Sequence, residues 1–201
     1  MKKQLLSILL FSGIIQFTSA QVYKKGNMSL FFGAGASNTL ANAINSVGEG
    51  ASNSFGPYIM GYQYHLTDKL TIGLAYTNQS ASTGKVTIDN GTDNVSFKTN
   101  FTFSTFLSQL NYSWYDNENG AIVLYSGLSA GTFTLNAGLE VLSGSKELAI
   151  INSDISEGMA YQITAIGYKG RFTKTSKLGA FAELGFGFNG IFNGGVQYTF
   201  N

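Results

Sequence analysis

The sequence has 201 residues, a length typical of one domain. Only 11% of the residues are charged, whereas 44% are hydrophobic and 14% aromatic, so the chain is too apolar to be intrinsically disordered. The absence of cysteine excludes a disulfide scaffold, a zinc–thiolate site and a cysteine nucleophile, and a net charge of +1 provides no field for binding nucleic acid. The composition therefore indicates a protein with much apolar surface and little charge to solvate it.

Residues 1–20 have the pattern of a secretory signal peptide, with cleavage expected between Ala20 and Gln21. Lys2 and Lys3 precede a mostly apolar run that is too short and too interrupted for a membrane-spanning helix. Without these lysines the chain keeps 10 of its 12 basic residues against 11 acidic ones, a net charge of −1. We therefore expect residues 21–201 to form one exported, nearly neutral domain.

The rest of the chain is dominated by period-two alternation, in which large apolar residues alternate with small or polar ones. This pattern predicts eight strands, at about 27–37, 55–66, 69–80, 97–115, 121–136, 159–172, 178–188 and 191–200. Short polar connections occupy 66–69, 116–120 and 173–177. Residues 38–54, 81–96 and 137–158 form long connections, and Asn189–Gly190 has the signature of a tight type I′ turn. The short connections take every second position and therefore lie at one end of the structure.

An even number of antiparallel strands, with short turns at one end and longer loops at the other, is typical of an outer-membrane β-barrel. A soluble barrel would also alternate, but it would need a polar outer face. In the last two strands that face would be mainly Gly, Asn, Gln and Thr, with Glu183 as its only charge. The predicted fold class is therefore all-β, an eight-stranded antiparallel transmembrane β-barrel, with both termini and the short turns in the periplasm.

Two strands do not alternate cleanly. In 97–115 the aromatic parity switches between Phe103 and Phe106, which a bulge or an extension beyond the membrane would explain. In 159–172 the faces conflict, because Gln162 and Thr164 oppose Lys169 and Arg171.

A basic residue facing lipid costs about 2–4 kcal/mol at mid-depth, so we place Lys169 and Arg171 in the lumen. Pairing about the 173–177 turn puts Glu183 opposite Gly167, with Lys169 as a diagonal neighbour. We therefore expect Lys169, Arg171 and Glu183 to form a luminal charge cluster that fills the barrel.

The signal peptide, the strand–turn–strand segment 62–76 and the terminal segment 194–200 resemble the small OmpA/OmpX-type outer-membrane β-barrel family. The resemblance covers essentially the whole mature chain and is specific for architecture rather than activity. It implies that the aromatic final strand, with Tyr198 and Phe200, is the signal that the barrel-assembly machinery reads. It also implies contact with outer-membrane lipid and lipopolysaccharide. Asn201 departs from the usual terminal Phe by one residue.

The sequence offers little chemistry: it predicts no catalytic, cofactor or metal site. His65 is the only histidine and is expected to be structural or solvated at the short-turn end. Glu49, Asp89 and Asp93, in long loops, are expected to be solvated, with cation binding as the alternative. An eight-stranded lumen is just wide enough for side chains to fill. We therefore expect a non-enzymatic structural or surface-interaction protein. The first alternative is a narrow channel or small-ligand transporter, and the second is a lipid-modifying barrel enzyme.

Overall fold

The computed structural model describes residues 23–36, 54–89, 94–117, 121–143, 152–173 and 176–200. The predicted signal peptide and Asn201 lie outside these residues. The strands are β1 (Met28–Ala36), β2 (Ser54–His65), β3 (Leu70–Ser82), β4 (Val86–Asp89), β5 (Asn94–Asp116), β6 (Ile122–Ser143), β7 (Asn152–Arg171), β8 (Leu178–Gly187) and β9 (Phe192–Phe200). No helix in the described part of the chain is long and apolar enough to cross a membrane.

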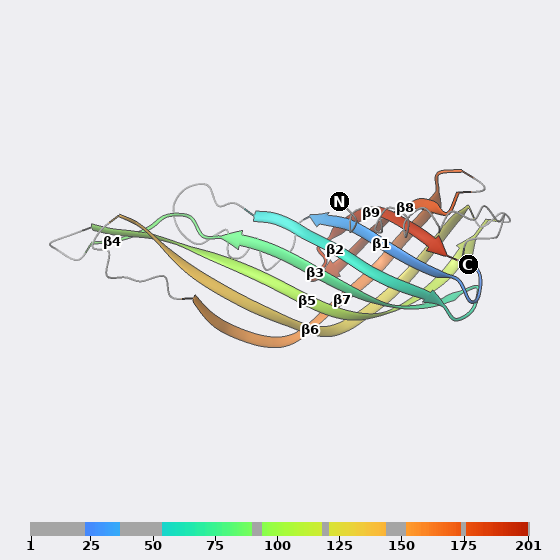
Figure 1. Cartoon of the computed structure of the whole chain (residues 1–201), viewed down its shortest axis with the longest axis horizontal. Coiled ribbons are helices and arrows are strands. Elements are labelled where there is room, and N and C mark those ends of the chain that lie inside the picture. Colours follow the sequence, from blue (N-terminus) through green and yellow to red (C-terminus); the bar gives the residue numbers. More distant parts are fainter. Residues whose placement is uncertain are drawn as a thin grey trace, which may run out of the picture.

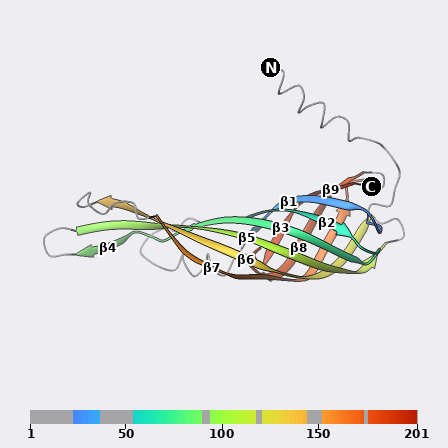
Figure 2. The same ribbon diagram turned by 60° about the horizontal axis from the view of Figure 1, so that its bottom comes forward.

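Eight of these strands close into an antiparallel barrel (Figures 1 and 2). The first and last strands pair from Met28–Phe200 to Ala36–Phe192, and β3 pairs with β5 to close the ring. The short β4 pairs with the far part of β5 and lies outside the barrel wall. The predicted closed eight-stranded antiparallel barrel is confirmed, with β4 as an added element.

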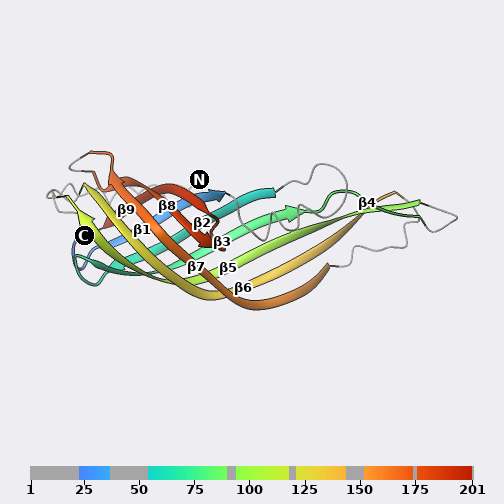
Figure 3. The ribbon, with the colours of Figure 1, turned by 180° about the vertical axis from the view of Figure 1, so that it is seen from behind.

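The two ends of the barrel differ. The short-turn end carries the β2–β3, β5–β6 and β7–β8 connections together with the start of β1 and the end of β9. The strands β5 and β6 have total lengths of 23 and 22 residues, whereas 9–11 residues are enough to cross a membrane. Both strands therefore extend beyond the barrel at the opposite, long-loop end. Their outer parts form a sheet with β4 and the start of β7 that projects from the barrel, as Figure 3 shows.

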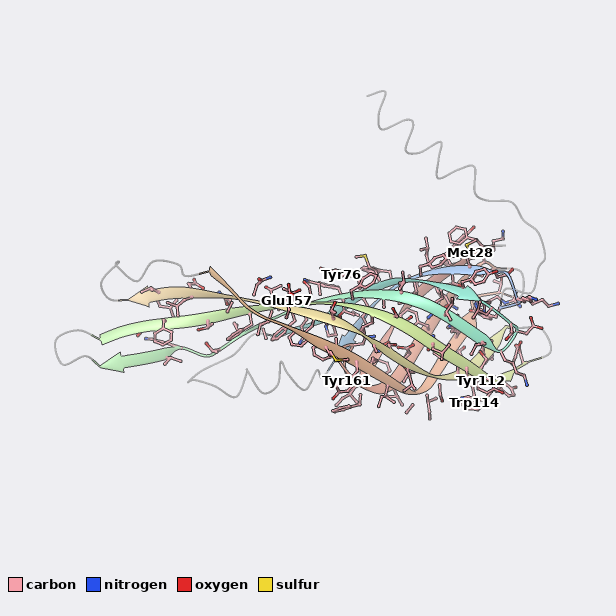
Figure 4. All side chains as sticks on the ribbon, turned by 90° about the horizontal axis from the view of Figure 1, so that it is seen from below. Met28, Tyr76, Tyr112, Trp114, Glu157 and Tyr161 are labelled. Atoms are coloured by element: carbon pink, nitrogen blue, oxygen red, sulfur yellow. The ribbon has the colours of Figure 1, made fainter. Side chains whose placement is uncertain are left out.

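The outer wall of the barrel is apolar. On β1 to β3, large apolar side chains point outward and their sequence neighbours point inward, as the alternation predicts. Tyr76 and Tyr161 lie toward the projecting sheet, whereas Tyr112 and Trp114 lie toward the short-turn end (Figure 4). Aromatic groups at two levels of an apolar band are typical of a barrel in a bilayer.

The parity switch in β5 has a simple cause. Its pairing with β3 is continuous from Tyr112 to Asn100, so no bulge separates Phe103 from Phe106. Phe103 points inward and is buried, whereas Phe106 faces outward. The strand extends beyond the membrane-spanning length, which is the second of the two explanations for its pattern.

A β-bulge resolves the conflict in β7. The register shifts between Thr164 and Ile166 against β8, so Ala165 is an extra residue and both Ala165 and Ile166 are exposed. The extra residue reverses the parity of the strand. Gln162 and Thr164 therefore point into the barrel, as does Lys169. The interpretation that Gln162 and Thr164 oppose the basic residues was wrong, because it assumed unbroken alternation.

Three predicted connections also differ. Much of 137–158 and part of 81–96 are strand, because β6 reaches Ser143, β7 begins at Asn152 and β4 lies at Val86–Asp89. Polar residues on both faces hid the start of β7, whereas β4 and the end of β6 do alternate but lie beyond the predicted strand bounds. The turn near Asn189 spans the four residues between Gly187 and Phe192 rather than two. Gly190 takes a φ of 93°, which explains glycine there.

Candidate functional site

The lumen holds a polar network built around two buried charges. Glu183 pairs with Gly167 in the β7–β8 ladder, the register expected from the 173–177 turn. The Tyr125 hydroxyl donates a hydrogen bond of 2.5 Å to Glu183 Oε1. Because Gly167 has no side chain, the Tyr125 ring can lie directly over it. The carboxylate thus has a donor in an otherwise closed interior, which a buried charge requires.

Lys169 is partnered differently from the sequence-based expectation. Its Nζ donates a hydrogen bond of 2.6 Å to Gln63 Oε1 and lies 4.6 Å from the centre of the Tyr125 ring. Gln63 Nε2 in turn donates to Gln109 Oε1 at 3.2 Å. Lys169 and Glu183 are therefore connected through Tyr125, which contacts both of them.

The structure thus places Lys169 and Glu183 inside the barrel, 4% and 7% exposed, whereas Arg171 is only partly buried near the short-turn end. Sequence reasoning missed Tyr125, because Ile122, Val123 and Leu124 are all apolar and give that strand start no detectable parity. Gln63 was detectable as the polar neighbour of outward tyrosines, but nothing in the sequence indicated that it reaches Lys169.

An apolar layer fills the lumen beside the polar network. Its buried members are Phe31, Ile59, Ala75, Leu107, Ala160 and Phe181, with Phe133 and Phe188 packed against them. Phe31 and Phe181 meet edge to face with ring centres 5.6 Å apart, and Phe133 stacks on Phe188 at 5.1 Å. Phe188 has the sequence parity of the outward-facing Leu184 and Phe186, yet it packs inward because β8 ends at Gly187 and alternation stops there.

Residues just before β1 close the lumen at the short-turn end. Tyr23 is buried, contacts Val123, and its hydroxyl accepts a hydrogen bond from Gln197 Nε2. Its ring centre lies 5.9 Å from that of His65. Burial raises the pKa of the Tyr23 phenol above its ordinary value, so the phenol stays neutral at physiological pH. An uncharged side chain therefore lies buried at this end of the barrel, within the electrostatic reach of Arg171 and Asp116.

The contacts of His65 indicate a structural role. It is buried at the end of β2, and its Nδ1 shares a hydrogen bond of 3.1 Å with Thr71 Oγ1. Within the described ranges, no three His, Asp or Glu side chains group as metal ligands would. Glu49 and Asp93 lie outside those ranges, and only the backbone of Asp89 is described.

The projecting sheet has its own small core. Ala81 and Phe103 are buried together, with Phe101 and Leu135 packed against them. On the exposed surface, Lys98 lies opposite Glu140 across the β5–β6 ladder, and Asn100 Nδ2 donates to Glu140 Oε2 at 3.3 Å. These contacts indicate an ordered sheet outside the apolar band rather than a loose loop.

These features define the class of the protein. A closed barrel leaves no strand edge unpaired in the wall, its outward side chains are apolar and its lumen is polar and filled. This is the arrangement of a small transmembrane β-barrel, since a hydrocarbon solvent requires every backbone group to be paired internally.

No protein-family model matches the chain, and no curated protein matches it. Among solved structures it resembles small outer-membrane barrels. The N-terminal β-barrel domain of Pseudomonas aeruginosa OprF is 16% identical, with a TM-score of 0.44, over 88% of this chain and 98% of that one. Ail, the attachment invasion locus protein of Yersinia pestis, is 10% identical, with a TM-score of 0.45, over 88% and 99%. The outer membrane protein OprG from Pseudomonas aeruginosa is 14% identical, with a TM-score of 0.46, over 90% and 99%.

Proposed function

We propose that the chain is a non-enzymatic bacterial outer-membrane protein that contacts other molecules through the sheet projecting from its long-loop end. The observation that carries this proposal is the length of β5 and β6, about twice what a bilayer needs. A structural anchor could end its strands at the membrane surface. Here the chain uses some ten extra residues per strand to hold a sheet outside it.

The projecting sheet offers two kinds of contact. Among the described pairings, β4 pairs only with β5, and residues 152–160 of β7 pair only with β6. Strand edges of this kind expose unpaired N–H and C=O groups that can bind an extended peptide. Leu142 is 48% exposed near the end of β6, so the sheet also presents apolar surface.

The filled lumen favours this function over a channel or transporter. Aromatic rings and the Lys169–Gln63–Gln109 chain cross the interior, and Tyr23 closes one mouth. In the proposed orientation the short-turn end and the termini face the periplasm and the projecting sheet faces the outside. The strand with Tyr198 and Phe200 is proposed to contact the assembly machinery, and the outer wall to contact lipid and lipopolysaccharide.

Trimming the sheet tests this proposal. Asn136 pairs with Asp154 and Ser80 pairs with Thr102, so an Asn-Gly turn can replace residues 137–153 and another can replace residues 81–101. Intact cells expressing the trimmed barrel should lose adhesion to surfaces coated with protein or polysaccharide. The wild-type protein and the trimmed barrel should both show heat-modifiable gel migration, which controls for folding. Equal adhesion by the two, or adhesion by neither, would contradict the proposed role.

A further inference from the structure

Four lysines lie on one continuous arc of the short-turn end: Lys24, Lys25, Lys69 and Lys177, called here the lysine arc. The Lys25 backbone N–H donates to Asp68 Oδ1 at 2.9 Å, which brings the segment before β1 against the β2–β3 turn that holds Lys69. The Thr199 N–H donates to the Lys177 carbonyl at 2.9 Å, and Thr199 pairs with Ser29 of β1. The four residues therefore follow one another around β8, β9, β1, β2 and β3.

The ammonium groups of the lysine arc are available. Lys24, Lys25 and Lys69 are exposed and Lys177 is partly exposed, and within the described residues their side chains form no hydrogen bond or ion pair. Asp68 lies within the arc, and one of its oxygens already accepts the Lys25 N–H. Asp116 on β5 lies at the border of the arc, close enough to Asp68 and Arg171 to interact with both. The arc is thus a surface of net positive charge in a nearly neutral protein.

The lysine arc also lies at a defined depth. Lys177 immediately precedes Leu178, Lys25 lies three residues before Met28, and Lys69 lies three before Ile72. Leu178, Met28 and Ile72 are exposed on the apolar outer wall. At about 3.3 Å per residue, the Cα atoms of these three lysines fall within roughly 10 Å of the exposed apolar wall, a depth at which their side chains can reach lipid headgroups.

The opposite end of the molecule has a different charge balance. Its described lysines are Lys85 and Lys98, and Lys98 lies opposite Glu140 in the ladder. Glu140 and Glu157 are both exposed there, and Glu157 lies at the junction of the barrel and the projecting sheet in Figure 4. Among the described residues, lysines without an acidic neighbour are therefore concentrated at the end where the strands leave the membrane through short turns.

We propose that the lysine arc binds the phosphate groups of anionic phospholipids in the leaflet that surrounds the short-turn end. Lysine is attracted to a negatively charged membrane surface, and at headgroup depth it can reach a lipid phosphate while its methylene stem covers apolar wall. The arc then gathers anionic lipid along one side of the barrel, over β8, β9, β1, β2 and β3. This inference requires the barrel to be in a bilayer but does not depend on the projecting sheet.

Spin-labelled lipids give a direct test. The barrel is reconstituted in phosphatidylcholine, and the association of spin-labelled phosphatidylglycerol is compared with that of spin-labelled phosphatidylcholine. The wild type should prefer phosphatidylglycerol, and added salt should weaken the preference through screening. Inorganic phosphate at the same ionic strength as a chloride control should give no additional loss, because it lacks the acyl chains that hold a headgroup at the arc.

Matched variants locate the effect. Lys24→Gln with Lys25→Gln should lower the preference, and adding Lys69→Gln and Lys177→Gln should abolish it. Lys85→Gln with Lys98→Gln removes two positive charges, as the Lys24 and Lys25 double variant does, and should leave the preference intact, as should the trimmed barrel. Heat-modifiable migration confirms that each variant is folded. Equal association of the two lipids with the wild type, or a preference that survives in the folded quadruple variant or falls equally in the Lys85 and Lys98 control, would overturn the proposal.

Discussion

Tyr125 is the residue on which both buried charges depend. It is 1% exposed, its hydroxyl donates to Glu183, and its ring lies beside the Lys169 ammonium. The hydroxyl stabilises the carboxylate through a charge-assisted hydrogen bond, and the ring face stabilises the cation. One side chain thus allows two opposite charges to share the lumen without direct contact.

Tyr125→Phe should lower the free energy of unfolding by about 1.5–3 kcal/mol, because it removes a hydrogen bond to a charged group. Glu183→Leu should cost more, about 3–5 kcal/mol, because it leaves Lys169 as a buried cation without a nearby anion. Urea unfolding in lipid vesicles measures both values. Stability equal to the wild type in Glu183→Leu would show that this carboxylate does not support the barrel.

A double-mutant cycle separates the contacts. The coupling energy between Tyr125→Phe and Glu183→Leu should exceed that between Lys169→Met and Glu183→Leu, since only the first pair shares a hydrogen bond. The sequence indicated that Lys169 and Glu183 point inward, because basic residues are costly in lipid. It could not indicate Tyr125, which lies in a run of apolar residues, and so it predicted a direct charge pair.

At the scale of the strands, the bulge in β7 decides which side chains reach the lumen. Ala165 is the extra residue, and its carbonyl accepts a hydrogen bond of 2.6 Å from Ser126 Oγ on β6. Without the bulge, Gln162 and Lys169 would point to opposite faces of the wall. Because of this one inserted residue, even-numbered polar residues before the bulge and odd-numbered ones after it both face the lumen.

Deletion of Ala165 should prevent folding into a heat-modifiable barrel in lipid. With the ladder held at Gln162, the deletion turns Lys169 toward lipid, at a cost that reaches about 2–4 kcal/mol at mid-depth and is smaller near the rim, and turns the other polar groups of β7 after the bulge with it. Ser126→Ala is the matched control, because it removes only the hydrogen bond to the bulge and should cost about 1 kcal/mol. Normal migration of the deletion variant would mean that the register of β7 is not fixed by this bulge.

The strands themselves were predictable where one face is wholly apolar. Alternation located all eight barrel strands, with close boundaries for β1, β8 and β9. It failed for the outer half of β7, where glycine and polar residues occupy both faces, and it ended β6 too early although Ala137, Leu139 and Val141 continue the alternation. Those segments are strands because they pair with β5 and with each other, a long-range cause that a single sequence does not display.

For the whole molecule, the filling of the lumen has a direct electrical consequence. Purified wild-type protein should show no stable unit conductance in planar bilayers, because Phe31, Phe181 and the Lys169–Gln63 bond obstruct the interior. Tyr23→Ala should open only the short-turn mouth and leave conductance unchanged. Reproducible current steps from the wild type would instead favour the channel hypothesis.

The barrel is closed by contacts between residues that are far apart in the chain. Ser29 and Thr199 share a hydrogen bond of 2.9 Å where β1 meets β9, and Tyr23 reaches Gln197 above them. These partners meet only when the last strand has joined the first. The natural chain has no cysteine, so a thiol introduced by Ser29→Cys would be the only one in the protein. Its reactivity toward a maleimide should fall when β9 joins β1, so the rate of that loss would measure when the final step of assembly occurs.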